Sequence, residues 1–409
     1  MKKEEFYAEA VAGSKGPLKG ITVLEATNNA AGPFAAMLMV DLGAESIKVD
    51  LPVKGDACRY VGPLLSEAPS KENSPLYLTI SRNKKNITLD LRKSKGKELF
   101  KELSKRVDVV LENYKPGTME KWGLGYRDIQ AVNPDIIYAS VSGYGQFGPN
   151  CHKPSYDQVG QSMGGMLAAT GYPDGPPIRN SYGFGDDLAG WQGAIGILAA
   201  LHYRKKTGRG QHVDVSQQDT IAYCSTFGIA AASAGFFWER HGNRLPVSSY
   251  SQVHQARDGC YVLIAASSEE QGAKLCRAIG REDLLPQECS CGCGCWEPLE
   301  EALSQWVKEQ KADEAVAVLE AAGLPATRIL DLPGVVQDPG LRERESIVEM
   351  DHPLAGRLTA YGPPAKFSRT PGGVCTPAPT LGQHNREIFC DMLSLSPEEL
   401  HQLEEEGVL

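Results

Sequence analysis

Ile21-Thr-Val-Leu-Glu-Ala26 is a short strand-like run, and Thr27-Asn-Asn-Ala-Ala-Gly-Pro33 leads from it into a helical pattern that ends at Leu42. A second strand-like run, Ser46–Asp50, follows. Strand, helix and strand in this order predict a βαβ unit with parallel strands. The connecting segment lacks the G-x-G-x-x-G pattern, so a nicotinamide-type dinucleotide site is not supported. Its small residues still offer backbone N–H groups to an anion.

The same alternation continues to residue 145 and predicts an α/β domain, in which helices cover a parallel sheet. Further strands are expected at Asn86–Leu91, Val107–Glu112 and Asp135–Val141, and helices at Pro33–Leu42 and Lys95–Arg106. Gly143-Tyr-Gly145 follows the last of these strands. Ligands of such sheets bind beyond the carboxyl ends of the strands, so we expect a site near Tyr144.

The second half of the chain predicts a smaller α/β domain. A helix is expected over Leu188–Tyr203 and a strand over His212–Ser216, before a change of domain within Gly235–Leu245. A further strand at Gly259–Ser267 and two helices within Trp296–Ala322 would form this domain. The expected division is 1–220 for the large domain, 221–325 for the small domain with its linkers, and 326–409 for a return to the large domain and a tail.

The charge balance and the N-terminus exclude several classes of partner. A formal charge of −9 over 409 residues provides no basic stripe for a nucleic-acid duplex. Residues 1–16 contain no apolar run long enough for a signal peptide or a membrane span. Most of the eleven cysteines stand singly in apolar surroundings, which favours reduced thiols. We therefore expect a cytoplasmic protein with neither a nucleic-acid nor a membrane partner.

Tyr182-Gly-Phe-Gly-Asp-Asp-Leu-Ala-Gly190 places two carboxylates between a glycine-rich turn and the expected start of a helix. By itself this pattern favours an N-cap role for Asp186 or Asp187. The same geometry suits a nucleophile, because a helix N-terminus stabilises an ionised carboxylate and Gly185 would let a bulky thioester approach. An ionised aspartate can attack an acyl carbon. Both roles remain open from this segment alone.

Short motifs follow one another along nearly the whole chain. They are Gly32-Pro33, Leu42-Gly-Ala44 with Ile47-Lys48, Leu89-Asp-Leu91, Glu112-Asn-Tyr-Lys-Pro-Gly117, Ser142-Gly-Tyr-Gly145, Thr170-Gly-Tyr-Pro-Asp-Gly-Pro-Pro177, Gly185-Asp186, Gly196-Ile-Leu-Ala-Ala-Leu201, Thr207-Gly-Arg-Gly-Gln-His-Val-Asp-Val215 and Pro379-Thr-Leu-Gly382. In this order they resemble the class III CoA-transferase family, which includes formyl-CoA:oxalate and carnitine CoA-transferases. The ordered set is far more specific than any one motif.

The resemblance implies a fold and a set of site residues. The fold would be a Rossmann-like, CoA-binding large domain with a parallel sheet and a smaller α/β domain, in an interlocked homodimer. Asp186 would be the aspartate that the donor thioester acylates. Coenzyme A and acyl-CoA would be substrates, with no tightly bound cofactor. The implied CoA contacts are Ala30, Ala31, Leu89, Arg92, Asn113, Tyr114, Lys121, Gly143 and Tyr144.

Two departures from the family pattern affect the expected phosphate contacts. Leu51 and Ser142 stand where some members place an arginine or a lysine. Lys54, Arg59 or Lys84 would then take the place of those cations. The glycine-rich loop that covers the nucleophile in the formyl-CoA enzyme is not evident in this sequence.

The mechanism that the resemblance implies begins with attack of Asp186 on the donor thioester, which gives an aspartyl–acyl anhydride and then an aspartyl-CoA thioester. Backbone N–H groups near Gly185 or Tyr144 would stabilise the oxyanion. The substrates would be small carboxylic acids and their CoA thioesters. The segment Gly55-Asp-Ala-Cys-Arg-Tyr60 is closer to the branch that acts on 2-hydroxy and arylpropenoyl acids.

Two other functions remain as alternatives. An α-methylacyl-CoA racemase shares the fold and the Gly-Asp motif, but it needs two acid/base groups. Those enzymes resemble one another in a Gly-His-Asp motif, and this chain has Ser155-Tyr156-Asp157 in its place, with Tyr156 at the position of the histidine. A non-catalytic CoA-binding protein would keep the fold and form no covalent adduct.

Cys289-Ser-Cys-Gly-Cys-Gly-Cys295 is the one low-complexity segment. Structural zinc sites usually combine two distant pairs of cysteines, each pair two to four residues apart. We expect a loop of the small domain and no metal site.

Overall fold

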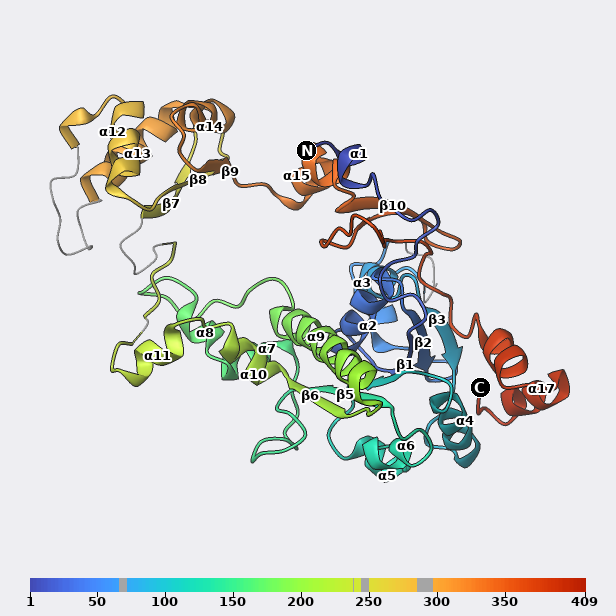
Figure 1. The fold of residues 1–409 in the computed structure, drawn as a ribbon. Coiled ribbons are helices and arrows are strands. Elements are labelled where there is room, and N and C mark those ends of the chain that lie inside the picture. Colours follow the sequence, from blue (N-terminus) through green and yellow to red (C-terminus); the bar gives the residue numbers. More distant parts are fainter. Residues whose placement is uncertain (66–71, 238, 244–249, 285–296) are drawn as a thin grey trace. The chain divides into compact units, whose positions relative to one another are not determined.

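A computed structural model describes residues 1–65, 72–237, 239–243, 250–284 and 297–409 (Figure 1). It confirms the predicted parallel sheet, which has six strands in the order β3-β2-β1-β4-β5-β6. Every neighbouring pair runs parallel. The strands are β1 (Thr22–Ala26), β2 (Glu45–Asp50), β3 (Lys85–Thr88), β4 (Val109–Glu112), β5 (Ile137–Ser142) and β6 (His212–Ser216). This is the doubly wound order, in which the direction of winding reverses between β1 and β4.

The third strand is shorter than predicted. The pattern indicated Asn86–Leu91, but β3 ends at Thr88. Beyond this point the backbone N–H of Asp90 donates to the carbonyl of Val408 at 2.8 Å. The C-terminus of the chain therefore takes the hydrogen bond that a continued strand would have used, and periodicity within one segment does not reveal such a partner.

Helices cover both faces of the sheet. On one face α2 (Ala31–Asp41) and α9 (Phe184–Thr207) lie side by side over the inward side chains of β1, β4 and β5, and they share one apolar core with them (Figure 1). On the other face α4 (Ser94–Ser104), α5 (Thr118–Trp122), α6 (Tyr126–Gln130), η3 (Glu387–Met392) and α17 (Pro397–Glu405) contribute to a second core. Residues from the end of the chain, such as Phe389, thus pack beside residues of α4.

Shorter elements complete this part of the molecule. They are α1 (Lys3–Phe6), η1 (Ala57–Tyr60), α3 (Pro75–Ile80), α7 (Asp157–Met163), α10 (Gln217–Tyr223), α11 (Gly228–Ser233), α16 (Pro339–Glu343) and the hairpin of β10 (Ile347–His352) and β11 (Gly356–Tyr361). The short α8 (Met166–Ala169) begins in this part at Met166 and continues outside it. The small residues of α9 permit its close packing on α2. A Cβ atom at Gly190 would lie 2.8 Å from the carbonyl oxygen of Ala31, so only glycine allows this approach.

The chain divides into two units. The first consists of Met1–Met166, Arg179–Phe236 and Pro339–Leu409, and the second of Leu167–Ile178 and Phe237–Asp338. The second unit holds the antiparallel sheet β7 (Tyr250–Gln255), β8 (Tyr261–Ala266) and β9 (Ala326–Arg328), with α12 (Glu269–Ala278), η2 (Glu282–Leu284), α13 (Glu297–Glu309), α14 (Ala312–Ala321) and α15 (Leu332–Gln337). Because β9 pairs with β8, the chain returns to the first unit at Pro339, later than residue 326.

Candidate active site

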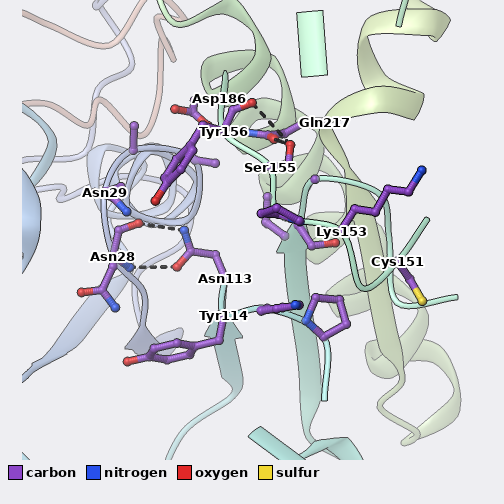
Figure 2. Close-up of a pocket in the computed structure, with 18 residues that line it drawn as sticks. Asn28, Asn29, Asn113, Tyr114, Cys151, Lys153, Ser155, Tyr156, Asp186 and Gln217 are labelled. Atoms are coloured by element: carbon purple, nitrogen blue, oxygen red, sulfur yellow. Dashed lines mark hydrogen bonds between the residues drawn. The ribbon is translucent and has the colours of Figure 1, made fainter. Parts of the chain in front are cut away.

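A cavity of about 330 Å³ opens at the carboxyl ends of β1, β4 and β5 (Figure 2). This is the point where the strand order reverses, which is where open α/β sheets bind ligands. Its lining comprises residues 28–31 after β1, 113–116 after β4, 141–143 at the end of β5, Cys151 and residues 153–156 of the following loop, and Asp186 and Gln217. Every one of these residues belongs to the first unit.

The wall that follows β1 is held by side chains from two other segments. The backbone N–H of Asn28 donates to Asn113 Oδ1, and Asn113 Nδ2 donates to the carbonyl of Asn28, both at 2.8 Å. The N–H of Asn29 donates to Asp56 Oδ1 at 2.9 Å. Asn29 has a left-handed φ of 62°, a conformation that asparagine tolerates better than most residues. These bonds fix the turn that leads to Ala30 and Ala31.

Asp186 occupies the first turn of α9, and its position corrects the N-cap expectation. The helix begins at Phe184 and its N-cap is Gly183, so neither Asp186 nor Asp187 is the cap. Instead, Asp157 Oδ1 accepts hydrogen bonds from the backbone N–H groups of Gly185, at 2.7 Å, and of Asp186, at 3.3 Å. A carboxylate 28 residues earlier in the sequence therefore caps this helix.

Gly185 has a different role from the one that the sequence indicated. It is buried, and a Cβ atom at this position would lie 2.7 Å from the carbonyl oxygen of Asp157. Glycine is thus required for the packing of α9 against α7, not for the approach of a thioester. Of the backbone N–H groups near Gly185 or Tyr144 that we expected to stabilise an oxyanion, the one of Gly185 already donates to Asp157.

The carboxylate of Asp186 lies half-buried at the cavity wall and contacts Gln217, the first residue of α10 (Figure 2). Gln217 Nε2 donates to Asp186 Oδ1, and Ser155 Oγ donates to Gln217 Oε1 at 3.0 Å. Burial, followed by the charges of Asp157 and Asp187, raises the pKa of Asp186 to about 7. Burial and Asp157 raise the pKa of Asp187 to about 6. These carboxylates are therefore high-energy anions at neutral pH.

The structure brings together six of the ten predicted site residues. Ala30, Ala31, Asn113, Tyr114, Gly143 and Asp186 line the cavity. The other four lie elsewhere. Leu89 is buried in the core beneath α4, Arg92 is exposed and pairs with Asp90 at 2.7 Å, Lys121 is exposed on α5, and Tyr144 is half-buried without contributing to the lining.

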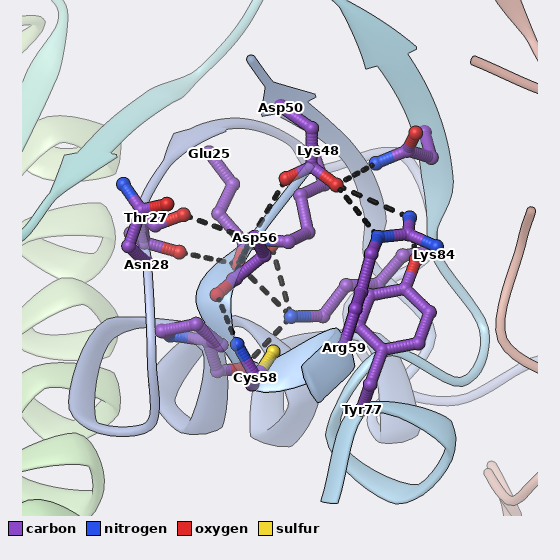
Figure 3. A network of polar contacts seen from close by, with 12 residues as sticks. Glu25, Thr27, Asn28, Lys48, Asp50, Asp56, Cys58, Arg59, Tyr77 and Lys84 are labelled. Carbon is purple, nitrogen blue, oxygen red and sulfur yellow. Dashed lines mark hydrogen bonds and ion pairs between the residues drawn. The ribbon is translucent and has the colours of Figure 1, made fainter. Parts of the chain in front are cut away.

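Two of the three substitute phosphate partners are wrong. Arg59 and Lys84 are fully buried, and each is bound to acidic side chains (Figure 3). Arg59 Nη2 lies 3.1 Å from Asp50 Oδ2, and Lys84 Nζ lies 3.0 Å from Glu25 Oε2. A phosphate cannot reach these cations without opening the core. Lys54 is exposed.

Several cavity residues were not selected from the sequence. Asn28, Asn29, Lys115, Cys151, Lys153, Ser155 and Gln217 all line it. One signal was available for Gln217, since it directly follows β6 at the same edge of the sheet as residues 28–31 and 113–116. Its contact with Asp186 spans 31 residues, and no local pattern encodes that distance.

The expectations about a metal site and a membrane span can be compared with the structure over the described residues only. Cys289–Cys295 lies outside them. Among the described residues, no cluster of histidine, cysteine, aspartate or glutamate side chains has the geometry of a metal site. Within the same ranges, each helix is too short or too polar to span a bilayer.

The protein is thus of the α/β class, with a doubly wound sheet and a half-buried aspartate at the wall of its switch-point cavity. Residues 18–385 match the model of CoA-transferase family III, so the chain belongs to this family and is a class III CoA-transferase.

Relatives of known name cover nearly the whole chain. The chain is 37% identical to succinyl-CoA–D-citramalate CoA-transferase of Chloroflexus aurantiacus, over 96% of this chain and 98% of that protein. It is 32% identical to the succinyl-CoA–L-malate CoA-transferase beta subunit of the same organism, again over 96% and 98%. A solved CAIB/BAIF family protein from Brucella suis superposes with a TM-score of 0.82 at 30% identity, covering 92% of this chain and all of that one.

Proposed function

We propose that the protein transfers CoA from an acyl-CoA donor to a small carboxylic acid, with covalent intermediates on Asp186. The observation that carries this proposal is the position of Asp186, at the wall of the switch-point cavity with its carboxyl oxygen toward Gln217. A carboxyl group whose pKa is about 7 is partly ionised at neutral pH. Its anion is poorly stabilised by the surroundings, which favours nucleophilic attack.

The proposed reaction has four steps. Asp186 Oδ2 attacks the donor carbonyl carbon, and CoA leaves as the thiolate, giving an aspartyl–acyl anhydride. The thiolate attacks Cγ of Asp186, a C–S bond forms, and the donor acid leaves as its carboxylate. The acceptor carboxylate attacks Cγ and releases the thiolate. The thiolate then attacks the acceptor carbonyl carbon, and Asp186 leaves as the free carboxylate. No proton is gained or lost overall.

The thiol end of CoA would enter the cavity past Ala30, Ala31, Asn113, Tyr114 and Gly143, which all line it. Arg92 and Lys121 lie outside the cavity and are exposed, so we assign them to the phosphate end of CoA. Leu89 is buried and would act through the shape of the turn that carries Arg92. Tyr144 borders the cavity residue Gly143 and is assigned to the pantetheine arm.

We propose that the acid that accepts CoA is a 2-hydroxy acid, and succinyl-CoA is the first donor to test. D-citramalate and L-malate, named for the two Chloroflexus relatives, are both 2-hydroxy dicarboxylic acids. The arylpropenoyl acids are the second group of acceptor acids to test. Coupled assays of CoA transfer with each donor and acceptor pair would rank them. Transfer to arylpropenoyl acids alone would contradict the first assignment.

Intact-mass spectrometry after mixing with donor thioesters tests the covalent mechanism. The wild-type protein should gain the mass of CoA less one water, and Asp186→Ala should gain nothing. Asp219→Ala is the matched control, since Asp219 is an exposed acidic residue of the first turn of α10. CoA binding without an adduct across the panel would instead indicate a non-catalytic CoA-binding protein.

Racemase chemistry is the second candidate, and Tyr156 argues against it. Its phenol lines the cavity and is 69% exposed, where the racemase pattern has a histidine. A neutral phenol is a far weaker base at neutral pH than the imidazole of a histidine. Incubation with a 2-methylacyl-CoA in D2O should therefore give no deuterium at the α-carbon. Rapid exchange at that carbon would reverse the preference.

We also propose that the protein is a homodimer. Large apolar side chains are exposed on the outer side of α9 and along α10 and α11, which suggests that a partner covers them. They are Trp191, Ile195, Tyr223, Phe227 and Ile229. Light scattering should give twice the chain mass, and Ile195→Asp should lower it. A monomer at micromolar concentration would contradict the proposal.

A further inference from the structure

Gln217 is the one cavity residue that the described structure places in hydrogen-bond contact with the side chain of Asp186 (Figure 2). Its side chain is 5% exposed, and its amide lies between two groups. Nε2 donates to Asp186 Oδ1, while Oε1 accepts from Ser155 Oγ at 3.0 Å. An ionised carboxylate can only accept hydrogen bonds, so the nitrogen end of the amide faces Asp186 when Asp186 is ionised. The hydroxyl of Ser155 donates to the oxygen end of the amide.

Two glycines make room for this pair of side chains. A Cβ atom at Gly143 would lie 2.1 Å from Cβ of Ser155, and one at Gly160 would lie 2.7 Å from Cβ of Gln217. Both positions therefore require glycine if Ser155 and Gln217 are to keep their places. The amide of Gln217 is preorganised by its surroundings before any ligand enters the cavity.

The backbone groups nearest to Asp186 are already engaged. The N–H groups of Gly185 and Asp186 both donate to Asp157 Oδ1. These two groups are not available for charge that develops on Asp186, whereas Gln217 Nε2 already donates to its carboxylate.

We propose that Gln217 is a catalytic residue that stabilises the oxyanion formed at Asp186 Oδ1 whenever Cγ of Asp186 is attacked. This inference rests on the proposed function. When the CoA thiolate attacks Cγ of the anhydride, the C–S bond forms and the electron pair of the carbonyl moves to Oδ1. The pair then returns and the bond to the donor carboxylate breaks. The acceptor carboxylate passes through the same oxyanion when it displaces the thiolate. Ser155 is a positioning residue that orients the amide.

Two isotope exchanges separate this role from a structural one. Exchange of labelled CoA into the donor thioester needs attack at the acyl carbon only, whereas exchange of labelled donor acid needs attack at Cγ. In Gln217→Met, which keeps the side-chain volume and removes the donor, acid exchange should fall about 100-fold. CoA exchange should be retained or rise. Gln218→Met, one residue further along α10, is the control and should leave both rates unchanged. Equal loss of both exchanges, or loss of neither, overturns the inference.

Ser155→Ala tests the positioning role on the same two rates. Acid exchange should fall about tenfold while CoA exchange is kept, and the double variant with Gln217→Met should be no worse than Gln217→Met alone. Additive losses in the double variant would show that Ser155 does not act through Gln217.

A measurement that needs no turnover separates failure of this inference from failure of the proposed function. The pKa of Asp186 can be followed by 13C NMR of its labelled carboxyl group. The charged neighbours of this group, Asp157 and Asp187, are the same in every variant. Loss of the donated hydrogen bond should raise this pKa in Gln217→Met. An unchanged pKa refutes the contact itself. A raised pKa in a protein that forms no CoA adduct would support the contact and refute the transferase chemistry.

Discussion

Two groups of carboxylates in the first unit differ in whether cations accompany them. The Lys48 network consists of Glu25, Lys48, Asp50, Asp56, Arg59, Tyr77 and Lys84, which are labelled in Figure 3, and of Glu72, which pairs with Arg59. The Asp186 cluster consists of Asp157, Asp186 and Asp187. Both lie near the carboxyl ends of the strands. In the network each carboxylate has a cationic partner, and in the described part of the chain no ion pair involves a member of the cluster.

The network uses its charges to hold the fold. Lys48 is fully buried, and its Nζ lies 2.8 Å from Asp56 Oδ2 and 3.4 Å from Asp50 Oδ1. Burial alone would lower the pKa of Lys48, but Asp56, Asp50 and Glu25 raise it well above its ordinary value. Lys48 Nζ also donates to the carbonyl of Thr27 at 2.8 Å, next to the turn that lines the cavity. The paired charges therefore fix the wall of the site.

The Asp186 cluster has no cation to balance its charges, and the pKa values of Asp186 and Asp187 are raised. Burial alone would raise the pKa of Asp56, but Lys48 lowers this pKa below its ordinary value. For Asp186, burial and the two like charges of Asp157 and Asp187 raise the pKa to about 7. The same side chain thus becomes a structural anchor beside a cation and a reactive anion without one. The following four predictions test this contrast, from the largest expected effect to the smallest.

Removing the central cation of the network should be the most damaging change. Lys48→Met leaves three buried carboxylates without their shared partner, and we expect a loss of about 3–5 kcal/mol in the free energy of unfolding. Urea denaturation monitored by fluorescence measures it. Lys85→Met is the control, because Lys85 makes its ion pairs with Glu45 and Glu387 at the surface. That variant should lose about 1 kcal/mol or less, and an equal loss in both variants would contradict the contrast.

Removing a charge from the cluster should instead stabilise the protein. The folded-state pKa of Asp186 is raised, so its ionisation opposes folding, and this penalty is absent below about pH 4 and complete above about pH 7. A rise to about 7 corresponds to about 4 kcal/mol at most, and partial contact with solvent reduces it to about 2 kcal/mol. Asp186→Asn should gain this amount at about pH 8. A gain that does not shrink on acidification would point to another cause.

The acylation rate should follow the ionisation of Asp186. Between about pH 5.5 and about pH 8, kcat/KM for a donor thioester should rise about 30-fold, because only the ionised form of a group with a pKa of about 7 attacks. Stopped-flow detection of CoA release gives the profile. A profile that is flat above about pH 5 would mean that the free enzyme holds Asp186 ionised throughout.

Weakening the repulsion inside the cluster should have the smallest effect. Asp157→Asn keeps an oxygen that can accept from Gly185 and Asp186 but removes a negative charge. The midpoint of the pH–rate profile should move down by about one pH unit or less. Asp219→Asn, at an exposed position in the first turn of α10, should leave the midpoint in place. An upward movement in Asp157→Asn would show that Asp157 acts mainly by capping.

The sequence by itself predicted most of the sheet and six residues that line the cavity. Alternating strand and helix patterns predicted β1, β2, β4, β5 and β6 within a few residues, because apolar periodicity is a local property. Ordered motifs identified the family, and they selected Asp186 from two adjacent aspartates as the nucleophile that we propose. They also selected five other residues that line the cavity, because these stand directly after strands or within short motifs.

The tertiary structure decided what surrounds that aspartate. Asp157 caps α9 from 28 residues away, Gln217 reaches Asp186 across 31 residues, and Ser155 reaches Gln217 across 62. Burial of Arg59 and Lys84 likewise follows from contacts with acidic residues on other segments. A side chain's charge, partner and exposure depend on which distant segments the fold brings together, and a pattern read along the chain contains no measure of those distances.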